Sequence, residues 1–91
     1  AMDSEATLAD LVVAVAGGDR GALRSLYLRQ SVRLFGIAQA ILRDRDAAAD
    51  ALQDAFLRVS QRAGQFDPAR GEAGAWLAGI VRHAALDMAR R

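Results

Sequence analysis

The side chains that could carry chemistry gather near the end of the chain. Arg82, His83, Asp87, Arg90 and Arg91 follow one another closely there. His83 is the only histidine and there is no cysteine, which excludes disulfides and thiolate metal sites. His83 and Asp87 are four residues apart and would share a helix face, but a zinc site needs three or four ligands. We interpret them as a surface pair and predict no metal and no cofactor.

Catalysis has no support in the sequence. The four serines lie on other predicted helices than His83, so a Ser-His-acid arrangement is not favoured. The segment 71–74 is too short for a phosphate-binding loop of the Walker type, and no lysine follows it. We therefore predict that the chain is not an enzyme and that it works by binding.

Binding of nucleic acid is compatible with the basic residues, but it is not the only explanation for them. All 12 are arginines, and the planar guanidinium suits phosphates, base edges and carboxylates. The net charge is only +1, so the chain as a whole does not attract DNA strongly. Arginines at a helix end also complement the helix dipole, and a GC-rich genome would favour arginine over lysine.

Four amphipathic helices are predicted to position these side chains. They span 4–16, 20 to about 42, 46 to about 63, and a last stretch that begins near Trp76. Asp3 or Ser4 is expected to cap the first helix, Asp19 the second, and Asp44 or Asp46 the third. Gly17 and Gly18 end the first helix, and Pro68 cannot lie within one. No strand pattern is present, so the sequence predicts an all-α, compact bundle of three to four helices.

Apolar residues recur at helical spacing and predict the buried faces. The helices are expected to bury, in order, Leu8, Leu11, Val12 and Val15; Leu23, Leu26, Tyr27, Leu34, Ile37, Ala38, Ile41 and Leu42; Ala48, Leu52, Ala55, Phe56 and Val59; and Trp76, Leu77, Ile80, Val81, Ala84 and Met88. Gly36 costs about 1 kcal/mol relative to alanine within a helix, so we expect a neighbouring helix to approach closely there. A row of arginines, Arg20, Arg24, Arg29 and Arg33, is expected to form a solvated face.

Length and composition indicate one small domain. The chain has 91 residues, enough for a single core. No apolar run approaches the ~18 residues needed to cross a membrane, and no export signal is present. Ala1 before Met2 looks like a cloning scar, so residues 3–91 are expected to form the domain. The lack of a helix-ending residue at Arg91 suggests a domain cut from a longer protein.

Several motifs, in the right order and at the right spacing, resemble one known family. Asp50–Arg58 (DALQDAFLR) resembles the D-x-x-Q-[ED]-x-F-[LI]-[RK] helix of bacterial sigma factors. Phe66–Gly71 (FDPARG), followed by Ala75–Leu77 and Ile80–Asp87, resembles the next part of the same domain, and Gly18–Tyr27 also fits. The likeness is greatest to the extracytoplasmic-function (ECF) group of the sigma-seventy superfamily and covers nearly the whole chain. It implies region two of such a factor.

The resemblance implies a surface for RNA polymerase. In the family this domain binds the clamp helices of the β′ subunit of the polymerase core. The matching residues here are Asp50, Gln53, Asp54, Leu57 and Arg58. Carboxylates beside an amide and an apolar edge can dock an arginine-bearing helix. The alternative is that the two carboxylates only balance nearby arginines.

The resemblance also implies a surface for promoter DNA. In the family the loop and the last helix recognise and melt the minus-ten element and capture a flipped base of the non-template strand. The matching residues are Gln65, Phe66, Asp67, Arg70 and Glu72 in the loop, and Arg82, His83, Asp87, Arg90 and Arg91 on the helix. Phe66 is the aromatic residue that could stack on a base, although it and Trp76 also suit the core.

Two helix positions depart from the family pattern or carry an unexpected charge. His83 stands where family members often have asparagine, so the preferred bases are expected to differ. Asp87 would repel phosphate, so it is expected to orient a neighbouring arginine or to accept a hydrogen bond from cytosine.

The resemblance implies a bacterial, cytoplasmic protein, nucleoid-associated when bound to polymerase, with an anti-sigma factor as a further partner and no membrane insertion. The family's second domain, a helix-turn-helix for the minus-thirty-five element, is absent from this chain. One alternative is a helical protein-interaction domain, bound by an anti-sigma factor, that does not recognise DNA. Another is a helical DNA-binding module unrelated to polymerase.

Overall fold

The computed structural model describes residues 6–91, which form helices joined by turns and a loop and contain no strand. Their elements are α2 (Leu8–Ala16), α3 (Arg20–Leu42), α4 (Arg45–Arg62), the 3-10 helix η1 (Ala63–Gln65) and α5 (Ala73–Ala89). The predicted all-α fold is confirmed. No helix in this part of the chain is both long enough and apolar enough to cross a membrane.

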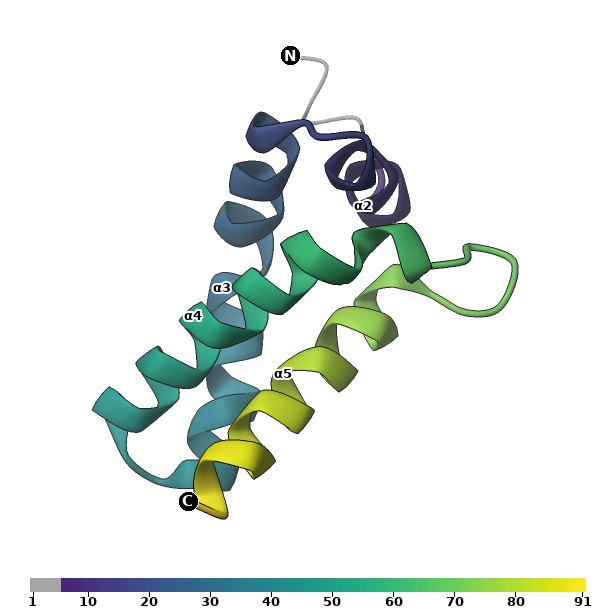
Figure 1. The fold of residues 1–91 in the computed structure, drawn as a ribbon. Helices are drawn as coiled ribbons and strands as arrows, with labels where there is room; N and C mark the ends of the chain where they lie inside the picture. The colour runs from purple at the N-terminus through teal and green to yellow at the C-terminus, as the bar shows by residue number, and fades with distance from the viewer. Residues whose placement is uncertain (1–5) are drawn as a thin grey trace.

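Three long helices form the body of the molecule (Figure 1). α3, α4 and α5 each pack against the other two, and α4 and α5 run antiparallel in front of α3. α2 packs against α3 and η1 at one end of the body. The loop 66–72 projects from that end, whereas the C-terminus lies at the other end.

The core is built from aliphatic and small side chains. The largest fully buried ones include Leu26, Leu34, Leu77 and Val12. About half of the buried residues are alanines, which lets the helix backbones approach one another closely. Within residues 6–91 no polar or charged residue is buried, so the groups that could bind a partner all lie at or near the surface.

The first helix begins later than expected. The prediction started it at residue 4, but Ala6 and Thr7 are not helical and α2 starts at Leu8. Thr7 and Asp10 form a capping box, in which each side chain accepts a hydrogen bond from the other's backbone N–H, at 3.0 and 3.1 Å. The predicted caps Asp3 and Ser4 lie outside the described residues.

The other helix ends follow local capping. Asp19 caps α3 by accepting from the Ala22 N–H, as predicted. Asp44 rather than Asp46 caps α4. That helix ends at Arg62, within one residue of the expected end, and continues as η1. The last helix was expected to begin near Trp76, but this start is wrong, because α5 begins at Ala73. Ala73 is buried in the core, and its packing holds the first turn of the helix.

Of the 23 predicted core positions, 15 are buried, seven are partly buried and one, Tyr27, is exposed. All five predicted positions of α4 are buried. Tyr27 was expected to be buried, but it is 43% exposed, and its ring contacts that of Phe56 edge-on at a centroid distance of 5.1 Å. The explanation offered for Gly36 is also wrong, because a Cβ there would meet nothing within 4 Å.

The row of arginines on α3 is not simply a solvated face. Arg29 donates to the backbone carbonyl of Ala6 at 2.6 Å. Arg33 donates to the carbonyl of Gly74 at 3.0 Å, which joins the middle of α3 to the first turn of α5. Only the first half of the row, Arg20 and Arg24, is exposed without such a bond among the described residues.

Candidate functional site

The loop after η1 and the start of α5 enclose a hollow of about 340 Å³. It is lined by Gln65, Phe66, Asp67, Arg70, Gly71, Glu72, Ala75 and Trp76. All five loop residues that the resemblance implied therefore lie around one space. Asp67 also shapes the loop, because its carboxylate accepts the Ala69 N–H at 2.9 Å and its carbonyl accepts the Arg70 N–H at 3.0 Å.

Phe66 and Trp76 form an aromatic wall of this hollow. Their ring centroids are 5.4 Å apart and the ring planes are tilted by 52°. Both residues are half-buried and pack against the core. Trp76 was predicted to be a core residue, but it also lines the hollow. The two rings thus combine a structural role with an accessible apolar surface.

A second hollow, of about 270 Å³, continues from the first along α5. The two share Gln65, Ala75 and Trp76, and the second reaches His83. Its α5 residues are the pairs Ala75–Trp76 and Gly79–Ile80 and then His83, which recur every three or four positions and so follow one face of the helix. We call the two hollows together the loop–helix recess. Sequence reasoning missed Arg62, at the end of α4, which also lines it.

The predicted DNA-binding cations are spread along α5 and are not gathered in one place. Arg82 is exposed next to His83 but lines neither hollow. Its side chain has no bond to any described residue, so its guanidinium is available. Arg90 and Arg91 are exposed at the C-terminal end of the helix, beyond the recess.

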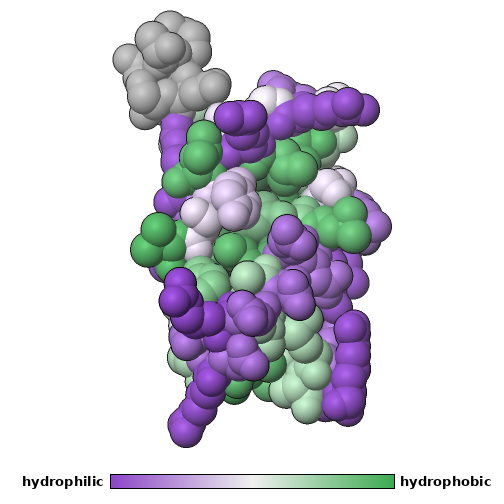
Figure 2. Space-filling model, turned by 90° about the vertical axis from the view of Figure 1, so that its left-hand side faces the viewer, coloured by the Kyte–Doolittle hydropathy of each residue, from purple (hydrophilic) through white to green (hydrophobic). Residues whose placement is uncertain are grey.

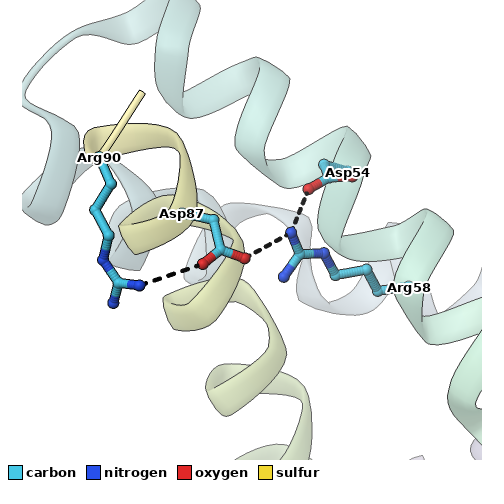
Figure 3. A network of polar contacts seen from close by, with 4 residues as sticks. All are labelled: Asp54, Arg58, Asp87 and Arg90. Atoms are coloured by element: carbon cyan, nitrogen blue, oxygen red, sulfur yellow. Dashed lines mark hydrogen bonds and ion pairs between the residues drawn. The ribbon is translucent and has the colours of Figure 1, made fainter.

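Asp87 belongs to an ion network between α4 and α5 (Figure 3). Its carboxylate accepts from the Arg58 guanidinium at 2.9 Å, and Arg90 lies 3.8 Å away. The hydrogen bond from Arg58 lowers the pKa of Asp87 below the ordinary 3.8, aided by the positive charges of Arg58, Arg90 and His83, although partial burial opposes this. His83 and Asp87 do not form the direct pair that was predicted. Asp87 does orient an arginine, as expected, because it binds Arg58.

The predicted polymerase-binding residues divide between two directions. Asp50, Gln53 and Leu57 are exposed on the outer side of α4, which we call the outer α4 face. The side chains of Asp50 and Gln53 bond to no described residue. Asp54 and Arg58 are partly covered and point toward α5, where they form an ion pair of 3.0 Å. The balancing role considered for the two carboxylates therefore holds for Asp54 and not for Asp50.

An apolar surface on α3 was missed by the sequence analysis. Tyr27, Leu28, Val32 and Phe35 form it, and Val32 is 87% exposed. Figure 2 views the side where α3 and the start of α4 lie, and apolar groups interrupt the hydrophilic surface there. Two hollows that share Tyr27 run along it and reach α4, at Leu52 and Phe56. The sequence did contain a signal for this surface, because Leu28 and Val32 are four residues apart and lie outside the row of buried α3 positions.

Comparisons with known proteins agree with this architecture. Residues 26–91 match the family model of sigma-70 region 2. The chain is 34% identical over 76 residues to the "ECF RNA polymerase sigma factor SigK" of Mycobacterium bovis (strain BCG / Pasteur 1173P2), covering 84% of this chain and 41% of that relative. The chain is also 36% identical to the protein of the same name from Mycobacterium sp. (strain KMS), and the match covers 84% of this chain and 39% of that relative. No solved structure gives a match.

The chain therefore belongs to the sigma-70 region 2 family, and its relatives are sigma factors of the ECF group. It spans about two fifths of the length of the curated relatives it matches.

Proposed function

We propose that this domain acts in transcription initiation, in the cytoplasm of a bacterium, by tying the RNA polymerase core to the minus-ten promoter element. The observation that carries the proposal is the loop–helix recess, which combines an aromatic wall with polar side chains and extends to His83 beside the unpaired Arg82. No catalytic step is required of the domain.

The recess suits a single base taken out of the DNA stack. Removing a base from a duplex costs a few kcal/mol, which the protein must return through stacking and hydrogen bonds. Phe66 and Trp76 offer apolar ring surface, and Gln65, Asp67 and Glu72 offer donors and acceptors for a base edge. Arg82 would bind phosphate, whereas His83 would contact a base or the backbone.

The outer α4 face suits the clamp helices of the β′ subunit. Asp50 and Gln53 present a carboxylate and an amide without internal partners, which can bind arginines of a docking helix. Leu57 on this face and the apolar α3 surface beside α4 would supply the buried, apolar part of the interface. The proposed contact is therefore larger than the helix that the sequence motif covers.

The DNA part is tested with fluorescently labelled single-stranded DNA of random sequence, 12 nucleotides long. Arg82→Ala is expected to weaken binding about two- to fivefold and to reduce the slope of log K against log salt by about 0.7, the loss of one phosphate contact. Arg24→Ala is the matched control, since Arg24 is exposed and unpaired but lies outside the recess. Equal DNA binding by the unsubstituted chain, Arg82→Ala and Arg24→Ala contradicts the proposal and favours the protein-interaction alternative.

The polymerase part is tested by pull-down with a β′ clamp-helix fragment. Gln53→Ala is expected to weaken capture about two- to tenfold, because a hydrogen bond across the interface is lost, and Asp50→Arg to weaken it further. Both variants should retain DNA binding, and Arg82→Ala should retain clamp binding. A capture that neither substitution changes counts against the proposal.

Two alternatives remain distinguishable by the same measurements. An anti-sigma factor would find the apolar α3 surface and the outer α4 face equally exposed, so capture of such a protein without DNA binding favours a protein-interaction domain. Tight binding of duplex DNA in the absence of polymerase favours a general DNA-binding module.

A further inference from the structure

One arginine nitrogen connects the two surfaces to which we assign function. Nη2 of Arg58 lies 3.0 Å from Oδ2 of Asp54 and 2.9 Å from Oδ2 of Asp87 (Figure 3). Asp54 belongs to α4, beside the outer α4 face, and Asp87 belongs to α5, among the candidate DNA-binding residues. The two carboxylates therefore share one donor across the helix interface.

The three side chains differ in exposure in a way that would allow Arg58 to couple Asp54 to Asp87. The Arg58 side chain is only 15% exposed, whereas those of Asp54 and Asp87 are 35% and 44% exposed. A partner can therefore reach either carboxylate from outside, but the guanidinium between them stays with the protein. A cation that approaches Asp54 competes with Arg58 for the same carboxylate.

We propose that Arg58 couples the two surfaces: a cation that the polymerase brings to Asp54 leaves Arg58 to pair with Asp87 alone, and DNA binding is strengthened. This inference rests on the proposed function. The three groups carry a net charge of −1 when Arg58 is shared. Once Asp54 is neutralised by a partner, Arg58 and Asp87 form a neutral pair, and repulsion of phosphate near the end of α5 falls.

The geometry explains why Asp87 can be tolerated on a DNA-facing helix. The hydrogen bond from Arg58 stabilises the charged form of Asp87 and lowers its pKa, so the negative charge is balanced by an internal cation. Arg90 lies 3.8 Å away and is a weaker partner than Arg58. Arg58 is thus a positioning residue, which acts on DNA through Asp87 and need not touch the nucleic acid itself.

The coupling is tested on the present chain, without polymerase, by a substitution that imitates the occupied Asp54. Asp54→Asn is expected to raise the affinity for the random single-stranded 12-mer about two- to fivefold at low salt. Asp50→Asn is the matched control, because it removes the same charge one turn earlier on α4 but does not touch Arg58. It is expected to have a smaller effect.

A double-mutant cycle tests whether the effect of the Asp54 substitution depends on Asp87. In an Asp87→Asn background, Asp54→Asn should raise the affinity no more than Asp50→Asn does. Asp54→Ser repeats the test with a different polar side chain, and thermal unfolding monitors the fold of every variant. Equal gains for the Asp54 and Asp50 variants, or an Asp54 effect that persists without Asp87, overturn the inference alone. If the unsubstituted chain fails to bind the DNA, the proposed function is overturned and the inference with it.

Discussion

At the scale of single residues, the candidate site contains two kinds of side chain. Three residues stabilise the fold and also face a candidate surface: Asp67 through a turn, Phe66 through a ring contact and Asp87 through an ion network. Asp50 and Arg82 have no bond to any described residue. Substitution of the second kind is expected to change binding with little loss of stability, whereas substitution of the first kind changes both.

The lowered pKa of Asp87 predicts a dependence of stability on pH. A carboxyl group whose pKa is lower in the folded state stabilises the fold fully above its unfolded pKa, and that contribution is lost as pH falls. The extra stability of the unsubstituted chain over Asp87→Asn should therefore be constant near neutral pH and shrink as pH falls below about 3.8. Urea unfolding at a series of pH values measures it. A difference that does not change with pH would refute this role of the Arg58–Asp87 pair.

At the scale of helices, contacts from α3 hold the element that carries the recess. Arg33 donates to the carbonyl of Gly74 in the first turn of α5, directly after the loop. Its guanidinium also donates to Gln30 on its own helix at 3.0 Å, which fixes its direction. The position of the loop–helix recess therefore depends on a residue that lies on neither of its walls.

Removal of this contact should loosen the start of α5. Arg33→Met keeps much of the side-chain length but loses the donor, and we expect a loss of about 0.5–1.5 kcal/mol in the free energy of unfolding. Hydrogen exchange should also quicken in the first turn of α5. Arg24→Met is the control, because Arg24 has no such bond. Unchanged exchange in Arg33→Met would show that packing of Ala73 suffices to hold the turn.

Periodicity predicted the helices better than it predicted their ends. The spacing of Leu26, Leu34 and Ala38 identified the buried side of α3, because burial of one face imposes that spacing on any packed helix. The start of α2 was missed because the Thr7–Asp10 capping box was overlooked in favour of earlier polar residues. The start of α5 was missed because Glu72 makes no side-chain cap, so no local signal marks it.

At the scale of the whole molecule, the buried core and the exposed apolar surface lie on the same helix. Leu34 is fully buried and Val32, two residues earlier, is 87% exposed. A helix turns by about 100° per residue, so these two side chains point in nearly opposite directions. α3 therefore stabilises the bundle with one side and presents an apolar surface with the other.

These two residues give a matched pair of predictions. Leu34→Ala should reduce the free energy of unfolding by about 2–5 kcal/mol, because it leaves a cavity in the core. Val32→Ala should change it by no more than about 0.5 kcal/mol but should weaken capture by the β′ clamp fragment. Urea unfolding and the pull-down assay measure the two effects. A large loss of stability in Val32→Ala would mean that the exposed valine serves the fold.

The candidate site could be predicted only where it follows from residues close in sequence. The motif from Asp50 to Arg58 and the loop residues around Phe66 were identifiable because they are contiguous. The bond between Arg58 and Asp87 joins residues 29 positions apart, and the recess is lined by Gln65 of η1 together with α5 residues as far as His83. Neither can be derived from spacing along one helix, because both depend on how α4 and α5 cross.

The core of residues 6–91, in which no polar or charged residue is buried, has a consequence for how such a domain can diversify. Because no polar residue is buried between the helices, the outward-facing positions of the loop and α5 can be exchanged for those of a relative, provided that Asp87 is kept as the partner of Arg58. If the proposed function holds, we expect such an exchange to change the preferred promoter bases while the scaffold stays the same.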